Sequence, residues 1–237
     1  MARIDSQQYY DEPALANDFC EGYVSLPVGI IFPPLVVIIM GIFLAVALTS
    51  IKVDVAAIPE GEIQTSTLKV DGHIAPLFTP EVRRWEKKII AWSKTHNLDP
   101  NLVATVMQIE SCGDPKAVSH AGAMGLFQVM PYHFSAGENA YQPGTNAQRG
   151  LAYLRRALDA RGGDVGLGLA GYNAGITGAK RPKSAWPNET IQYVYWGTGI
   201  YADAQKGKSH SARLDEWLGR GGASLCAQAA SRLDLQQ

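Results

Sequence analysis

The chain has 237 residues, enough for one sizeable domain and an appended segment. Hydrophobic residues make up 46% of the chain and charged residues 18%, a balance that excludes an intrinsically disordered protein. The net charge is −1, and the few basic pairs fit ordinary solvated faces, so no nucleic-acid partner is expected.

The charge is unevenly spread along the chain. Before Lys52 one basic residue stands against five acidic ones, and from Lys52 onward 20 basic residues stand against 17 acidic ones. A mildly basic C-terminal part would tolerate an anionic polymer surface. The same excess is also that of a plain solvated surface, so it identifies no partner.

An uncharged run of 26 residues, 26–51, follows a polar, acidic tail at residues 1–25. About 20 apolar residues span a bilayer as a helix, so residues 26–51 are predicted to be a single transmembrane anchor. The alternative is a cleaved signal peptide, because Ala45-Val46-Ala47 resembles a cleavage site. A signal peptide, however, has a short basic leader and an apolar core of about 7–15 residues.

Residues 52–78 mix charges, Gly and Pro without periodicity and are predicted to be a linker. Residues 79–237 are predicted to be the folded domain. Its first helix is expected to begin with Thr79 as the N-cap and Pro80 in the first turn. The apolar residues of this helix recur at helical spacing, at Val82, Trp85, Ile89 and Trp92.

Further helices are predicted along the domain. The second begins at Asp99-Pro100, and the third covers about residues 147–160 and ends at Gly162-Gly163. Two more are expected around residues 165–172 and 189–204. Strand patterns are weak, so the domain should be mainly α.

Glu110 lies where the apolar stripe of the second helix requires a hydrophobic residue. Buried carboxyls are rare unless they are paired or functional. Burial raises a carboxyl pKa, and a carboxylic acid that stays protonated near neutral pH can protonate a glycosidic oxygen. The alternative is that Glu110 ends the helix in a frayed turn and faces solvent.

The residues after Glu110 favour a functional site. Gly113-Asp114-Pro115 predicts a turn, and Gly122 and Gly125 permit tight backbone turns beside a cleft. Amide, hydroxyl and aromatic side chains follow in the stretches 171–175 and 189–194, and such groups suit a sugar-binding groove.

Four sequence blocks together resemble the lysozyme-like domain of soluble lytic transglycosylases, which is related to goose-type lysozymes. The blocks are Glu110-Ser111 followed by Ser119, then G-x-x-G-L-x-Q-x-M-P at residues 122–131, then Tyr172-Asn173-Ala174-Gly175, and Glu189-Thr190 with Tyr193-Val194. The resemblance covers about residues 80–205. The chain departs from the family pattern at Gly171, where Ala is usual, and in the shorter, more polar stretch 132–150, which alters one cleft wall rather than the chemistry.

The resemblance implies a mechanism with one carboxyl group. Ordinary glycosidases use two carboxylates, and Asp114, Glu138 and Glu189 are the candidates for a second one here. The family instead uses one glutamate twice, so Glu110 would first act as acid on the bond between N-acetylmuramic acid and N-acetylglucosamine. It would then act as base on the C6 hydroxyl, which closes a 1,6-anhydro ring without consuming water.

The resemblance also implies roles for the neighbouring residues. The muramoyl acetamido and sugar groups would be held by Ser119 and Gln128, and Met130 would line the groove. Tyr172 and Asn173 would position Glu110 and the sugar, and Glu189 and Tyr193 would support the far wall. No cofactor is implied, and the five histidines show no metal-binding spacing.

Cys112 and Cys226 both follow the predicted anchor, so they lie on the same side of it and could form a disulfide. Cys112 is not general to the family, which favours this pairing; the alternative is two separate buried thiols.

The predicted function is therefore a membrane-anchored peptidoglycan lytic transglycosylase, with glycan strands as substrate and the domain on the extracytoplasmic side of the cell membrane. Two alternatives stay open: a hydrolytic muramidase, and an accessory subunit of an envelope complex. The anchor or the N-terminal tail could also bind a membrane-protein partner.

Overall fold

The computed structural model describes residues 72–234, which belong to the second of two units into which the chain divides, residues 68–237. The predicted tail, the anchor at 26–51 and most of the linker lie outside the described residues. Within residues 72–234, no helix combines the length and the apolar character that crossing a bilayer requires.

The domain begins with two helices rather than the single helix predicted. Helix α2 covers Pro80–Arg83 and α3 covers Glu86–His96, with Trp85 between them. The predicted N-cap is wrong in its chemistry, because the Thr79 hydroxyl makes no cap bond. It donates instead to Gln108 Oε1 at 3.2 Å, as does the Thr79 backbone N–H. The chain already enters the core before Thr79, since Ile74, Ala75, Leu77 and Phe78 are buried.

Helix α4, Pro100–Ser111, is the central helix of the domain and is buried along most of its length. The predicted start is confirmed, because Asp99 Oδ1 accepts from the backbone N–H groups of Asn101 at 2.8 Å and Leu102 at 3.3 Å. Helices α3, α7 and α9 all pack against it. The helix ends at Cys112, whose φ of +48° is left-handed.

Helices α5 and α6 form a closely packed pair. Helix α5, Pro143–Asp159, begins about one turn earlier than predicted, because Gln142 Oε1 accepts from the Thr145 N–H at 2.6 Å. It is followed by the predicted stop at Gly162 and Gly163, whose φ angles are +64° and +83°. Helix α6 covers Val165–Ala174.

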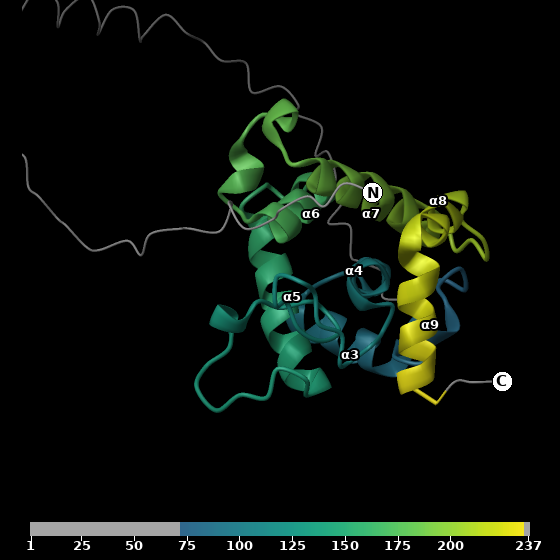
Figure 1. Ribbon diagram of the computed structural model, residues 1–237. Helices are drawn as coiled ribbons and strands as arrows, with labels where there is room; N and C mark the ends of the chain where they lie inside the picture. Colours follow the sequence, from purple (N-terminus) through teal and green to yellow (C-terminus); the bar gives the residue numbers. More distant parts are fainter. Residues whose placement is uncertain (1–71, 235–237) are drawn as a thin grey trace, which may run out of the picture. The chain divides into compact units, whose positions relative to one another are not determined.

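Helix α7, Asn188–Gln205, follows two short 3₁₀ turns, η2 at Gly178–Lys180 and η3 at Lys183–Ala185. It packs on α4, α6 and α8, and in Figure 1 it extends across one end of the domain from α6 to α8. Its bounds agree with the predicted helix around 189–204.

The described part of the chain ends in a kinked C-terminal segment that the sequence patterns did not predict. It consists of α8 at Ala212–Trp217, the wide turn η4 at Leu218–Gly222 and α9 at Ala223–Arg232. Helix α9 packs against α2 and α4, and Figure 1 shows it alongside α4. The kinked C-terminal segment therefore covers part of the central helix.

Residues 112–131 link α4 to the short 3₁₀ helix η1, Pro131–His133, without forming a strand. The segment contains isolated antiparallel bridges of Met124 with Val118 and with Val129. The prediction of a mainly α domain is confirmed for residues 72–234.

Candidate active site

Glu110 lies in the last turn of α4 and is half-buried, so the predicted alternative of a frayed, solvated end does not hold. The hydroxyl of Tyr193, on α7, donates to Glu110 Oε1 at 2.8 Å. Tyr193 is itself buried, with 5% of its surface exposed. The carboxyl is thus held between the central helix and α7.

The surroundings of Glu110 keep it protonated. Its pKa is raised from 4.5 to about 8, chiefly by burial; the hydrogen bond from Tyr193 lowers the pKa, and the negative charge of Glu189 adds to the rise. At neutral pH the side chain is therefore mainly a neutral acid. A neutral carboxyl has one carbonyl oxygen and one O–H, and because Tyr193 donates to Oε1, the proton belongs on Oε2.

Buried polar side chains fix the loop that follows Glu110. The Ser111 hydroxyl donates to the Leu126 carbonyl at 2.7 Å and accepts from the Gly113 N–H at 3.1 Å. Asn146, from α5, accepts from the Phe127 N–H at 2.9 Å and donates to the Met124 carbonyl at 2.7 Å. The loop is thus tied both to the end of α4 and to α5.

Ser119 and Gln128 lie in this loop, and their hydrogen bonds shape it. The Ser119 hydroxyl accepts from the Ala123 N–H at 3.0 Å. Gln128 has a left-handed φ of +44°, and its Nε2 donates to the Gly125 carbonyl at 2.9 Å and the Ala117 carbonyl at 3.3 Å. The structure thus brings both side chains into one folded loop, and neither forms a hydrogen bond with Glu110.

Tyr172 and Asn173 lie near the end of α6. The Tyr172 hydroxyl donates to the Phe127 carbonyl at 2.6 Å. Burial and the neighbouring charge of Glu110 raise the Tyr172 pKa well above its ordinary value, so it stays a neutral donor. The Asn173 Oδ1 accepts from the hydroxyl of Thr190 at 2.6 Å. Helix α6 is thereby joined to the loop on one side and to α7 on the other.

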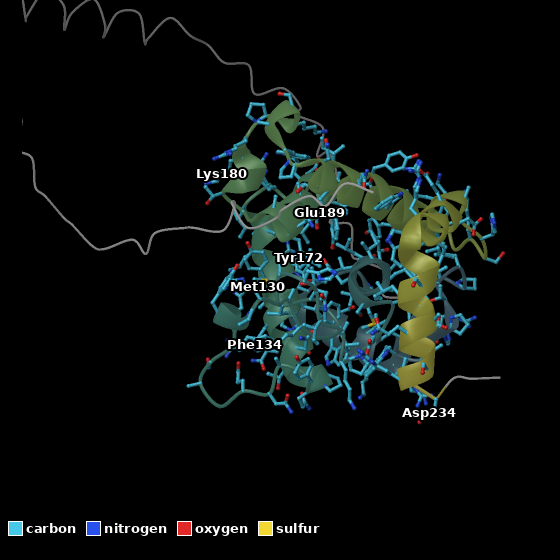
Figure 2. The ribbon with its side chains drawn as sticks, viewed as in Figure 1. Met130, Phe134, Tyr172, Lys180, Glu189 and Asp234 are labelled. Atoms are coloured by element: carbon cyan, nitrogen blue, oxygen red, sulfur yellow. A yellow bond between two sulfur atoms is a disulfide. The ribbon has the colours of Figure 1, made fainter. Side chains whose placement is uncertain are left out.

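Glu189 and Met130 border the same region. Glu189 is exposed in the first turn of α7, and Met130 is half-buried just before η1. Figure 2 shows Tyr172 between Met130 and Glu189 in this view. Glu189 lies close enough for its charge to raise the Glu110 pKa.

Two of the candidates for a second catalytic carboxylate, Asp114 and Glu138, form ion pairs with arginines. Asp114 is fully buried and forms an ion pair with Arg232 at 2.5 Å, while its Oδ1 accepts from the Lys116 N–H at 2.8 Å. Glu138 forms an ion pair with Arg149 at 2.7 Å. Both carboxylates therefore have structural partners, as a turn residue and a loop residue would.

The predicted disulfide is confirmed: Cys112 and Cys226 are bonded, with their Cα atoms 5.0 Å apart. It joins the end of α4, two residues after Glu110, to α9. Among residues 72–234, the one group of possible metal ligands is Glu81 with these two cysteines. Because their sulfurs are bonded to each other, they are not free thiolate ligands.

Part of the chain is similar to known proteins. Residues 87–194 match the family model of the transglycosylase SLT domain. All the predicted sugar-binding residues and Glu110 lie within this SLT segment, whereas the kinked C-terminal segment lies beyond it.

Individual relatives share parts of the SLT segment. The transglycosylase of Enterobacteria phage PRD1 is 45% identical over 112 residues, which are 46% of this chain and 40% of that protein. Membrane-bound lytic murein transglycosylase C of Actinobacillus pleuropneumoniae is 36% identical over 89 residues, 36% of this chain and 22% of that protein. The chain thus spans less than half the length of these relatives.

A solved structure of an inactive mutant of the lytic transglycosylase Slt from Pseudomonas aeruginosa is also similar, with a TM-score of 0.44 and 23% identity. The similarity covers 56% of this chain and 26% of that one.

Three supporting residues were not singled out from the sequence: Ser111, Asn146 and Thr190. Ser111 and Thr190 stand inside the recognised blocks, next to Glu110 and Glu189, and both are buried. Their position in the blocks was the feature of the sequence that could have indicated their supporting role. Asn146 offered none, because its partners are backbone groups up to 22 residues away.

Proposed function

We propose that this protein is a membrane-anchored peptidoglycan lytic transglycosylase, which cleaves the β-1,4 bond between N-acetylmuramic acid and N-acetylglucosamine without water. The observation that carries the proposal is the half-buried Glu110 carboxyl, with a pKa of about 8 and a hydrogen bond from Tyr193 at 2.8 Å. The match of residues 87–194 to the SLT domain supports it.

In the first step Glu110 acts as a general acid. Its Oε2 proton passes to the glycosidic oxygen, the bond from that oxygen to the muramoyl C1 breaks, and N-acetylglucosamine leaves with a new hydroxyl. The acetamido oxygen of the substrate stabilises the positive charge on C1. A pKa of about 8 keeps Glu110 protonated at neutral pH.

In the second step Glu110, now a carboxylate, acts as a general base. It takes the proton from the C6 hydroxyl of the same muramoyl residue, and the C6 oxygen bonds to C1 to close the 1,6-anhydro ring. The proton is thereby returned to Glu110, and no water is consumed. Tyr193 stabilises the transient carboxylate through Oε1.

The surrounding residues hold the glycan in this proposal. Ser119 and Gln128 bind the muramoyl acetamido and sugar groups, and Met130 lines the groove. Tyr172 and Asn173 position Glu110 and the sugar. These assignments rest on the sequence blocks and on the common loop and helix framework in which the residues lie.

The location of the protein is part of the proposal. Residues 26–51 carry no charge and are long enough to anchor the chain in a membrane. Several relatives are named membrane-bound lytic murein transglycosylases. A disulfide fits an oxidising compartment, so the domain is placed on the extracytoplasmic side.

The proposal is tested by digesting purified peptidoglycan with the detergent-solubilised full chain and with Glu110→Gln. The wild type should release soluble muropeptides, and the variant should lose at least about a thousandfold in rate, because it can neither donate nor accept the proton. Glu138→Gln is the matched control, since its carboxylate pairs with Arg149. Full activity of a folded Glu110→Gln variant would contradict the proposal.

A further inference from the structure

A pocket of about 320 Å³ opens between α7 and the kinked C-terminal segment, at α8 and η4. Its lining residues are Gln192, Tyr195, Trp196, Glu216 and Arg220. Only Gln192 lies within residues 87–194, so the pocket is formed mainly by the part of the chain beyond the SLT segment. Its volume is at the lower end of the range typical of small-ligand sites.

Helix α7 connects this pocket to the candidate active site. Gln192 follows Glu189 by three residues, and Trp196 follows Tyr193 by three, so each pair lies one turn apart on the same side of the helix. From Glu189 to Trp196 the helix rises only about 10 Å. A substrate group attached next to the cleaved bond could therefore reach the pocket along α7.

The wall of the pocket opposite α7 is held in place by close packing. The kinked C-terminal segment bends at Gly221, whose φ of +120° a residue with a side chain rarely adopts. A Cβ at Gly222 would approach the Trp217 ring to 2.4 Å, and one at Gly199 would approach the Arg213 side chain to 2.7 Å. The disulfide of Cys226 ties α9 to α4.

The two arginines of this region differ in their partners. Arg213 is fully engaged: its guanidinium lies 3.4 Å from the centre of the Tyr195 ring, donates to the Tyr195 carbonyl at 2.8 Å and lies 3.7 Å from Glu216. Glu216 also accepts from the Tyr195 hydroxyl at 3.0 Å. Arg220 is exposed and has no hydrogen bond or ion pair to any residue between 72 and 234.

The pocket thus offers the exposed guanidinium of Arg220, the amide of Gln192 and the aromatic side chains of Tyr195 and Trp196. Its one carboxylate, Glu216, accepts from the Tyr195 hydroxyl and is paired with Arg213. A guanidinium binds a carboxylate through two parallel hydrogen bonds, an amide can pair with a peptide group, and aromatic faces contact aliphatic side chains. Together these groups match a short peptide that carries a free carboxylate.

We propose that this pocket binds a free carboxylate of the stem peptide that peptidoglycan strands carry beside the bond cut at Glu110. The proposal rests on the proposed function, because that function supplies the peptide-bearing strand. Arg220 pairs with the carboxylate, Gln192 with the peptide backbone, and Trp196 and Tyr195 form the apolar wall. The enzyme therefore favours peptide-bearing strands over peptide-free ones.

The test measures binding rather than cleavage. In a full-length Glu110→Gln background, calorimetry compares a disaccharide–tetrapeptide with the same disaccharide lacking the peptide. The peptide-bearing ligand should bind about tenfold more tightly, as one charge-assisted hydrogen-bonded pair allows. Adding Arg220→Gln should bring this ratio close to one, and Arg220→Lys should retain part of it because it keeps the charge.

Arg84→Gln is the matched control, since Arg84 is an exposed arginine beside α2, which packs on α4 and α9. It should leave the affinity ratio unchanged. An unchanged ratio in a folded Arg220→Gln variant, or equal binding of both ligands by the parent, would overturn the proposal. The outcome is separate from that for the proposed function, which fails if the wild type produces no cleavage of either strand.

Discussion

The hydroxyl of Tyr193 lies 2.8 Å from Glu110 Oε1, although the two residues are 83 positions apart in the chain. The contact joins the end of the central helix α4 to α7. It also assigns the two carboxyl oxygens different tasks, because Oε1 accepts from Tyr193 and Oε2 remains for the proton that leaves. In the mechanism that we propose, one glutamate then acts as acid and as base without a second carboxylate.

The pH dependence of cleavage should follow the Glu110 pKa of about 8. The first step requires the protonated acid, so kcat/KM is expected to fall as the pH rises through about 8. This fall is the alkaline limb of the plot of kcat/KM against pH, and two variants should move it in opposite directions. Tyr193→Phe removes a hydrogen bond that lowers the pKa and should move the limb to higher pH, whereas Glu189→Gln removes a repulsive charge and should move it to lower pH.

The measurement is kcat/KM on a soluble muropeptide oligomer from pH 5 to pH 10. Asp159→Asn serves as a control for the loss of an exposed carboxylate, because Asp159 lies at the end of α5 in an ion pair with Arg155. Limbs that shift in the same direction in both variants would rule out the proposed protonation of Glu110.

The raised pKa of Glu110 should also cost stability. The folded state keeps a proton on Glu110 between pH 4.5 and about 8, whereas the unfolded chain releases it near 4.5. The stability that protonated Glu110 contributes to the folded state is thus fully present below pH 4.5 and is lost as the pH rises through about 8. Glu110→Gln has no carboxyl group at this position and does not lose this stability. The difference in free energy of unfolding, variant minus wild type, should therefore increase by more than about 1 kcal/mol between pH 4.5 and about 8. Urea unfolding at pH 5 and pH 8 measures the difference, and parallel pH curves would contradict it.

Thr190 is expected to act through Asn173. Its buried hydroxyl donates to Asn173 Oδ1 at 2.6 Å, so Thr190→Val keeps the side-chain shape but leaves the amide without its anchor. Turnover should fall about tenfold, the equivalent of one hydrogen bond. Thr190→Ser should restore most of it. The double variant with Asn173→Ala should be no slower than Asn173→Ala alone; additive losses would mean that Thr190 acts independently.

The disulfide should contribute to folding stability. Cys226→Ser opens a link between residues 114 positions apart and is expected to lower the free energy of unfolding by about 2–4 kcal/mol. Reductant should lower the stability of the wild type to the level of the variant and leave the variant unchanged. Equal stability of oxidised wild type and Cys226→Ser would show that α9 does not depend on the bond.

The sequence predicted those features whose causes are local. Asp99 caps α4 as expected, because its partners are the next two backbone N–H groups of residues 101 and 102. The Thr79 cap failed because Gln108, 29 residues away, accepts the Thr79 hydroxyl instead. Helices α8 and α9 were missed because three glycines between residues 219 and 222 interrupt their apolar pattern.

The site shows the same division. The unusual position of Glu110 on an apolar stripe could be recognised from spacing alone, but its contact with Tyr193 could not. The sequence blocks predicted a set of side chains around Glu110, of which Tyr193 bonds to it and Ser119 and Gln128 lie in the loop that follows it. They did not indicate which backbone groups Ser111, Asn146 and Tyr172 bind, because these bonds depend on how the helices pack.

The most direct test of the central claim is mass spectrometry of products formed by the full-length protein in H₂¹⁸O. If Glu110 directs the C6 hydroxyl onto C1, the muramoyl ends will be 1,6-anhydro, lighter by one water than reducing ends, and will contain no ¹⁸O. Glu110→Gln will yield neither product. Reducing muramoyl ends that carry ¹⁸O would contradict the account, because they would show that water, and not the C6 hydroxyl, attacks the sugar.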